Sequence, residues 1–244
     1  MANQPPAQVR LFGSVQICCE GTRIEHRLST TTQLLFAMLV TGEGDVLKRE
    51  EIAFTLWPDL PESEARANLR RHLYLLQRAL PGSTTPWIQS DAKTITWGAG
   101  ERPWVDVNDF KRLSATPDGI EAAVELYRGD FMQHADHEWA AAVRERLRAM
   151  FCKALDLAVS RRRERHDPTG ALRYIEQLLA YDPWREDALR DLMISRSRIG
   201  DRVGALAFYQ KFCHRIRAEF GVEPMPETVQ CREMVARGEA HASR

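Results

Sequence analysis

The chain has 244 residues, and 44% of them are hydrophobic, which is enough for the cores of one or two globular domains. Lysine plus arginine and aspartate plus glutamate both number 34, and the net charge of zero excludes a globally basic chain that binds nucleic acid along its whole surface. No stretch approaches the roughly 18 apolar residues of a membrane span, and the first residues lack the pattern of a secretion signal. We expect a cytoplasmic protein with no membrane partner.

The N-terminal part of the sequence predicts a small sheet, three helices and a hairpin. Residues 9–28 alternate apolar and polar side chains around a glycine turn, which favours short antiparallel strands. A helix capped near Ser29 should end at Gly42 and Gly44, and a second helix, "REEIAFTLW", should end before Pro58. The third helix should cover residues 62–80, and "WIQSDAKTITW" reads as a terminal hairpin with its turn at residues 90–93. This order is that of a winged helix-turn-helix.

Beyond about residue 100 the pattern changes to long helical segments. "GALRYIEQ" at Gly170 recurs as "GALAFYQK" at Gly204, 34 residues later, which is the period of tetratricopeptide helix pairs. Each pair leaves an apolar face that only a neighbouring pair can bury, so the repeats should stack into one layer. Such layers usually bind partners, so we expect a partner-binding and self-association surface here.

The third predicted helix carries a cluster of basic residues opposite an apolar stripe. At 100° per residue, Leu69, Leu73, Leu76 and Leu80 share one face, with Ala65 beside it. The side chains expected to point outward or to lie on the flanks suit phosphate and base edges; they are Arg66, Asn68, Arg70, Arg71, Tyr74, Gln77 and Arg78. A solvated arginine-rich surface is the alternative interpretation. The position after two short helices and before a hairpin favours a recognition helix.

The charge of this part of the chain limits what one copy can do. Residues 1–110 contain 11 lysine and arginine residues against 13 aspartate and glutamate residues, a net charge of −2. A net acidic domain should bind DNA weakly by itself and gain from a second copy on a neighbouring site.

Chemistry other than binding has little support in the sequence. The five cysteines include no C-x-x-C pair, and we interpret them as reduced thiols. Residues 134–138, "HADHE", lack the H-E-x-x-H spacing of a zinc site, and no phosphate-binding glycine loop or G-x-S-x-G motif is present. We expect no enzyme activity, no metal and no cofactor.

Several motifs carry a resemblance that covers nearly the whole chain: "VRLFGSVQI", "LWPDLPESEARANLRRHLYLLQRAL", "ELYRGDF", "HEWAAAVRERLR", "YDPWREDALRDLM" and "EFGVEPMPETV". The chain resembles the antibiotic-regulatory (SARP) family of bacterial transcriptional activators, whose helical half is the bacterial transcriptional activator domain (BTAD). The resemblance implies an N-terminal α+β winged helix-turn-helix of the response-regulator output type followed by an all-α tetratricopeptide-like domain. We therefore expect a flexible tail at residues 1–8, a winged helix at 9–100, the helical domain at 101–238 and a tail or truncated linker at 239–244.

The resemblance also implies a function and its partners. It implies an activator that binds direct repeats in double-stranded DNA near promoters and contacts RNA polymerase. Residues 62–80 would read the major groove, and the wing at residues 88–97 would bring Lys93 and Thr94 to a minor groove or phosphate. We expect two copies to associate on DNA, and a winged helix cut before about Trp104 to fold and bind one half-site weakly. The alternative is a protein-interaction scaffold whose winged helix no longer binds DNA.

Overall fold

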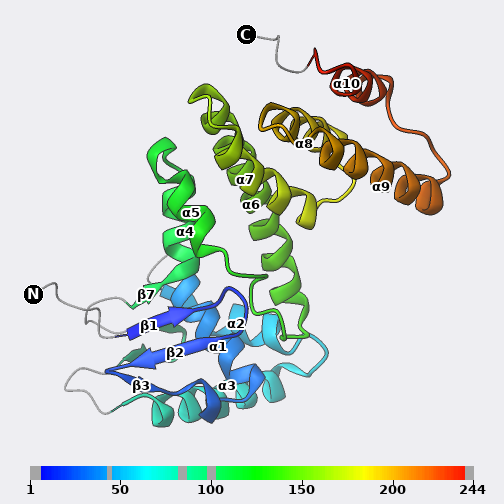
Figure 1. Ribbon diagram of the computed structural model, residues 1–244. Helices are drawn as coiled ribbons and strands as arrows, with labels where there is room; N and C mark the ends of the chain where they lie inside the picture. Colours follow the sequence, from blue (N-terminus) through cyan, green and yellow to red (C-terminus); the bar gives the residue numbers. More distant parts are fainter. Residues whose placement is uncertain (1–6, 43–45, 82–86, 98–102, 240–244) are drawn as a thin grey trace, which may run out of the picture. The chain divides into compact units, whose positions relative to one another are not determined.

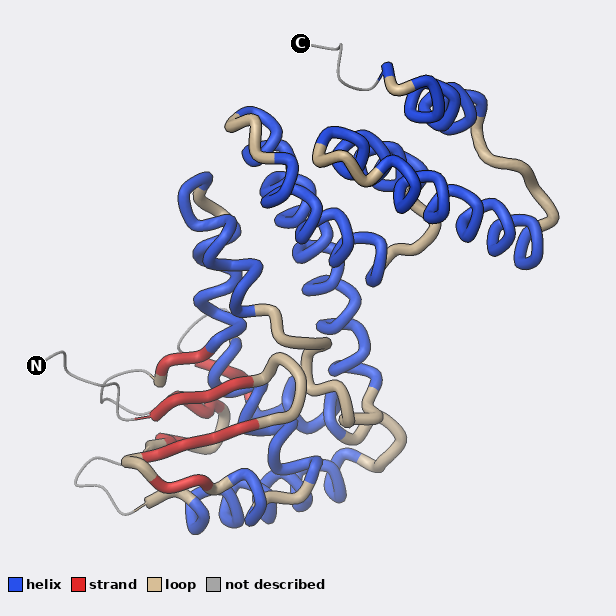
Figure 2. Tube along the Cα trace, in the orientation of Figure 1, coloured by secondary structure: helices blue, strands red, loops and turns tan. Residues whose placement is uncertain are grey.

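The computed structural model describes residues 7–42, 46–81, 87–97 and 103–239. The chain divides into two compact units, Met1–Leu147 and Arg148–Arg244. Among the described residues, every strand belongs to the first unit, whereas the second unit contains helices alone (Figure 1, Figure 2). The chain thus combines a mixed unit with an all-helical one.

The N-terminal sheet has four short strands in the order β3-β2-β1-β7. These are β1 (Ala7–Arg10), β2 (Gln16–Cys19), β3 (Thr22–Arg23) and β7 (Trp104–Val105). Glu20 and Gly21, with φ of 47° and 78°, form the two-residue turn between β2 and β3, because such hairpin turns require positive φ at both positions. Ala7 and Gln8, which we expected in a tail, belong to β1, where Ala7 pairs with Cys19. The rest of that tail and residues 240–244 lie outside the described residues.

Three helices follow, as the sequence predicts: α1 (Thr30–Thr41), α2 (Arg49–Leu56) and α3 (Glu62–Ala79), with a short 3-10 turn at Glu25–Arg27 (η1) before α1. The Ser29 hydroxyl accepts the Thr32 N–H at 3.3 Å and caps α1, whereas the predicted stop at Gly44 lies outside the described residues. The three helices meet on a core of fully buried side chains: Leu35, Phe36, Ile52, Ala53, Leu69 and Leu76.

A second sheet places the hairpin beside α2. Its order is β4-β6-β5, with β4 (Val46–Lys48), β5 (Ile88–Ser90) and β6 (Thr94–Trp97), and both pairings are antiparallel. Lys48 lies opposite Thr94, and the Arg49 N–H donates to the Lys93 carbonyl at 2.9 Å. The start of α2 is therefore fixed at the tip of the wing.

A buried carboxylate ties the first helix after the wing to the N-terminal sheet. Asp106, 3% exposed, begins α4 (Asp106–Ser114) and accepts the Leu11 N–H at 2.9 Å and 3.0 Å and the Phe12 N–H at 3.1 Å. β7 pairs in parallel with β1, and the rings of Phe12 and Phe110 pack edge to face at 5.3 Å. A 3-10 turn (η2, Pro117–Gly119) and α5 (Ile120–Leu126) complete this packing.

These contacts bear on two expectations. The expected boundary at residue 100 follows the change of sequence pattern, whereas the compact units divide after Leu147, because β7, α4 and α5 share a core with the N-terminal sheet. A fragment cut before Trp104 would lack β7 and would leave the Leu11 and Phe12 N–H groups without their acceptor. We no longer expect that fragment to be an intact winged helix.

The long helix α6 (Glu138–Glu164) begins in the first unit and ends in the second. The second unit continues with four helices: α7 (Pro168–Tyr181), α8 (Glu186–Arg198), α9 (Arg202–Phe220) and α10 (Pro226–Arg237). Successive helices α7, α8 and α9 pack on one another, as helix-pair repeats require. A core around Leu189, Met193 and Phe212 joins α8 to α9 and α10.

The 34-residue repeat includes a polar arrangement that we did not predict. Asp167 accepts the Gly170 N–H at 2.8 Å and the Arg162 guanidinium at 2.9 Å. At the equivalent position 34 residues later, Asp201 accepts the Gly204 N–H at 2.9 Å and the Arg196 guanidinium at 2.5 Å. Each aspartate therefore caps one helix of the repeat and fixes it to an arginine near the end of the preceding helix.

Candidate nucleic-acid interface

Helix α3 buries one face and exposes the other, as its sequence predicts. The buried side chains are Ala65, Leu69, Leu73 and Leu76, and Leu80 closes the stripe just beyond the last turn. Pro61 immediately precedes the helix, Glu62 and Glu64 occupy the first turn, and Arg78 occupies the last, so charges of both signs suit the helix dipole. The sequence thus produces an 18-residue helix with an exposed outer surface.

The exposed face carries the predicted basic residues. Arg70, Arg71 and Arg78 are all exposed, and the Tyr74 side chain is 57% exposed. The Arg78 guanidinium lies 5.8 Å from the centre of the Tyr74 ring and donates a long hydrogen bond of 3.5 Å to its hydroxyl. These four residues, called here the outer face of α3, combine cations with a flat aromatic side chain that can donate and accept hydrogen bonds.

Arg66 differs from the other arginines because it already has acidic partners. Its guanidinium lies 2.5 Å from a Glu62 carboxylate oxygen and 4.0 Å from one of Glu50. A phosphate would have to compete with both carboxylates. Asn68 is half-buried on the flank of the helix, so the structure exposes it less than the outer face.

The wing turn is organised by Asp91. Its carboxylate accepts the Lys93 and Thr94 N–H groups, each at 2.7 Å, and the Thr94 hydroxyl at 2.9 Å. These hydrogen bonds hold the pKa of Asp91 below its ordinary value. Lys93 is exposed at the tip, whereas the hydroxyl hydrogen of Thr94 is directed to Asp91, so Thr94 shapes the turn and could offer only an acceptor to DNA.

Arg49 joins this set although sequence reasoning missed it. Partial burial lowers its pKa first, and the nearby positive charge of Arg70 lowers it further, while Asp91 opposes the change. Arg49 therefore lies close enough to both Arg70 and the wing to interact with their charges. Sequence reasoning missed Arg49 because its position depends on a long-range contact, the pairing of β4 with β6, which brings the start of α2 to the wing.

Two other predictions concern residues outside this surface. His137 in "HADHE" contacts the Leu56 carbonyl at 3.4 Å and accepts the Trp139 N–H at 3.2 Å, which is a packing role. In the part of the chain that the structure describes, no three His, Cys, Asp or Glu side chains form a group able to hold a metal ion. None of the helices in that part has the length and apolar character needed to cross a membrane.

Comparison with known proteins decides the family. The model of the bacterial transcriptional activator domain matches residues 108–235, more than half of the chain. The chain belongs to the BTAD family. Its relatives include the transcriptional regulatory protein MoaR1 of Mycobacterium bovis and of Mycobacterium tuberculosis, each 23% identical over 239 residues that cover 90% of this chain and 76% of the relative.

Regulatory protein AfsR of Streptomyces griseus is 24% identical over 237 residues, which cover 92% of this BTAD chain but only 24% of AfsR. The solved structure of Mycobacterium tuberculosis EmbR, in complex with a low-affinity phosphopeptide, has a similar fold, with a TM-score of 0.71 and 17% identity. The similarity covers 96% of this chain and 66% of that one.

The BTAD chain is therefore a transcriptional activator of the SARP type, as its motifs indicate. The predicted fold class, an α+β winged helix-turn-helix followed by a tetratricopeptide-like helical domain, is confirmed. The relatives are named as regulators, not as enzymes.

Proposed function

We propose that this BTAD protein is a sequence-specific DNA-binding activator that occupies direct repeats near promoters and contacts RNA polymerase. The observation that carries the proposal is the outer face of α3, where exposed arginines and a tyrosine lie opposite a buried leucine stripe. The wing is linked to the same surface through Arg49, whose pKa responds to the charges of both Arg70 and Asp91.

Each part of the surface suits a different role in recognition. Arg70 and Arg71 can form paired hydrogen bonds with guanine edges or with phosphates, and Asn68 can pair with adenine from the flank. Lys93 and Arg49 suit phosphates beside the groove, because a flexible or partly buried cation fixes position without reading bases. Tyr74 and Arg78 together extend the contact toward the end of α3.

Acidic groups near the same surface make a single contact weak. Glu50, Glu62 and Asp91 lie within reach of Arg66 and Arg49, and the N-terminal 110 residues have a net charge of −2. A second copy on a neighbouring half-site makes the second contact intramolecular, at an effective concentration of roughly millimolar. Two copies in the same orientation about one helical turn apart, roughly 10–11 base pairs, would bring both recognition helices to the same side of the duplex.

The second unit supplies a surface for a protein partner, which in the proposal is RNA polymerase. A groove of about 490 Å³ lies among α7, α8 and α9, with an apolar floor that includes Leu179, Phe208 and Phe212 and with Lys211 and Arg215 in its lining. This groove also favours the second candidate function, a protein-interaction scaffold that does not bind DNA.

Selection from a pool of random-sequence duplexes, followed by fluorescence anisotropy at several salt concentrations, separates the two functions. We expect enrichment of direct repeats and a log affinity that falls linearly with log salt. The variant R70A/R71A should stay folded and lose about 1–3 kcal/mol for each base contact removed. The control R112A/R128A removes the same charge from exposed positions on α4 and after α5. Equal binding by both double variants would favour the scaffold.

Spacing tests the use of two copies. Inserting about half a helical turn, roughly five base pairs, between selected half-sites should abolish cooperative binding of the full chain. Equal affinity at both spacings would mean that the copies bind independently.

A further inference from the structure

The groove of about 490 Å³ among α7, α8 and α9 has a continuous apolar lining, and these helices lie side by side in the second unit (Figure 1). Leu189 and Leu192 of α8 and Phe212 of α9 are buried at its base. Leu179 and Phe208 line it as well and are half-buried. The groove therefore presents apolar surface that the helices of this unit do not cover.

One face of α9 places two cations along this apolar surface. Phe208, Lys211, Phe212 and Arg215 follow one another at intervals of three or four residues, so they share one side of the helix. Lys211 and Arg215 are both exposed, and the Lys211 ammonium lies 5.9 Å from the centre of the Phe208 ring. The charged groups thus border the apolar lining.

The positive charges of the groove are more available than its negative one. Two cations, Lys211 and Arg215, and one anion, Glu176, belong to the lining. The Glu176 carboxylate lies 2.7 Å from the Arg196 guanidinium, which also binds Asp201. Within the part of the chain that the structure describes, neither Lys211 nor Arg215 forms an ion pair, and both contact aromatic rings instead. A ligand that carries carboxylates would therefore find two cations that have no carboxylate partner.

An exposed aromatic pair extends the groove beyond Arg215. The Arg215 guanidinium lies 5.0 Å from the centre of the Trp184 ring, and Trp184 packs edge to face on Phe220 at 4.8 Å. Trp184 is 37% exposed and Phe220 is 56% exposed, and connected apolar surface of this kind marks sites of protein interaction. From Phe208 to Phe220 the helix rises about 18 Å, which matches a partner helix of about three turns and exceeds a small molecule.

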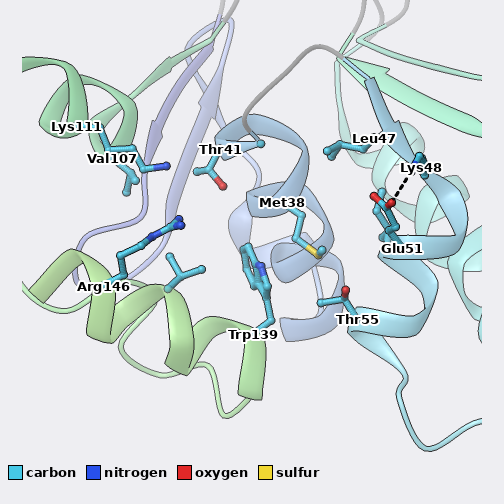
Figure 3. Close-up of a pocket in the computed structure, with 13 residues that line it drawn as sticks. Met38, Thr41, Leu47, Lys48, Glu51, Thr55, Val107, Lys111, Trp139 and Arg146 are labelled. Atoms are coloured by element: carbon cyan, nitrogen blue, oxygen red, sulfur yellow. Dashed lines mark hydrogen bonds and ion pairs between the residues drawn. The ribbon is translucent and has the colours of Figure 1, made fainter. Parts of the chain in front are cut away.

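A cavity of about 300 Å³ in the first unit provides a comparison site (Figure 3). Met38 and Trp139 give it apolar surface, as the leucines and phenylalanines do in the groove. Its Lys48, however, pairs with its Glu51 at 2.7 Å, and Lys111 also has an interaction partner. Removing Lys48 therefore makes a matched control for removing the unpaired Lys211.

We propose that the groove binds an acidic amphipathic helix of a protein partner, with the apolar face of that helix against Leu179, Phe208 and Phe212 and its carboxylates beside Lys211 and Arg215. A helix laid in a groove presents apolar side chains at three- and four-residue spacing, and acidic residues along its edge would meet the cations. The proposal rests on the partner-binding role given above to the second unit and adds the chemistry of the partner. A second copy of this chain and a small lipophilic acid are the competing occupants.

Isothermal titration of the full chain with two capped peptides tests the groove. The acidic probe is ELEELLEELEELLE, whose leucines share one helical face, and the basic probe KLKKLLKKLKKLLK has the same leucines. We expect saturable binding of the acidic probe and binding of the basic probe that is at least about tenfold weaker, because like charges oppose it. K211Q and R215Q should each weaken the acidic probe about two- to fivefold, whereas K48Q should leave it unchanged.

Charge reversal gives a result that loss of folding cannot imitate. K211E/R215E should prefer the basic probe to the acidic one, because the groove then carries carboxylates in place of cations. The control K153E/R232E makes the same charge change at exposed positions on α6 and α10, outside the groove, and should keep the preference of the wild type. Circular dichroism melting checks that both variants are folded.

The absence of saturable binding of the acidic probe, or equal affinity for the two probes in the wild type, would overturn the proposal. Binding of dodecanoate without binding of the peptide would assign the groove to a small acid and overturn it too. So would sedimentation analysis showing a dimer that K211E/R215E dissociates while the acidic probe fails to bind. The titration contains neither DNA nor RNA polymerase, so its failure leaves DNA binding by α3 intact, and failure of DNA binding would not change the titration.

Discussion

The carboxylate of Asp106 should be one of the main stabilising groups of the first unit, and D106A tests this. Its oxygens accept the Leu11 N–H at 2.9 Å and 3.0 Å, the Phe12 N–H at 3.1 Å and the Val107 N–H at 2.8 Å. The side chain is almost completely buried, so water cannot replace it without opening the packing between α4 and the sheet.

The expected loss follows from these contacts. A buried donor left without an acceptor costs about 1–3 kcal/mol, and D106A leaves three such donors. Part of this loss is offset, because burial raises the pKa of Asp106 despite the three N–H groups, which means that the buried charge itself costs desolvation energy. We expect the free energy of unfolding of the first unit to fall by about 2–4 kcal/mol. D106N keeps one acceptor oxygen and should lose less than D106A.

Urea unfolding followed by tryptophan fluorescence measures this change in one unit. Five of the six tryptophans lie in the first unit, so W184F as a background makes the signal specific to it. The control D136A removes an exposed carboxylate from the same unit. A loss below about 0.5 kcal/mol in D106A, the level of an ordinary surface substitution, would refute the assignment of Asp106 as an anchor.

Two further predictions concern single charges. E62Q should release Arg66 from its 2.5 Å ion pair and raise DNA affinity about two- to fivefold. The slope of log affinity against log salt should become steeper by up to about one. The control E64Q makes the same charge change without releasing Arg66. Weaker binding in E62Q than in E64Q would show that Arg66 does not contact DNA. The Gly204 N–H and the Arg196 guanidinium hold the pKa of Asp201 below its ordinary value. The charged Asp201 therefore stabilises the fold at pH values above the unfolded-state pKa of about 3.9. This contribution is lost as the pH falls through the lowered pKa of the folded state. The urea midpoint of D201N, which keeps a capping oxygen, should therefore lie below wild type at neutral pH and converge with it below about pH 4, and a constant difference at all pH values would contradict this.

Local signals were sufficient to predict the helices of the winged helix and the exposed face of α3. Ser29, Pro61 and Gly42 act within one helical turn of their own positions, and the leucines of α3 repeat at helical spacing, so sequence alone places them. The SARP resemblance, and not periodicity, supplied the fold of the whole chain and the type of regulator.

Long-range contacts were beyond such reasoning. Arg49 joins the basic surface only through strand pairing between β4 and β6, and Asp106 reaches Leu11 across 95 positions of the chain. No local pattern separates this buried aspartate from the half-buried Asp109 in the same helical turn. The domain boundary expected at residue 100 follows a change of pattern and lies close to the start of the BTAD match at residue 108, whereas the compact units, which follow the packing, divide after Leu147.

The distribution of charge along α3 shows how a chain of zero net charge can carry the basic surface that we propose binds DNA. At the first turn, Glu62 satisfies the helix dipole and at the same time neutralises Arg66, so this end offers little excess positive charge. One turn later Arg70 lies near enough to Arg49 for its charge to lower the pKa of Arg49, so the two positive charges repel each other. A phosphate placed between two such cations would remove their repulsion as well as gain two ion pairs, so the affinity should concentrate where α3, α2 and the wing meet. The total charge of the chain sums the neutralised first turn of α3 with the basic region around Arg70, so it does not reveal the local excess of positive charge. The local arrangement of charges therefore determines where DNA would bind.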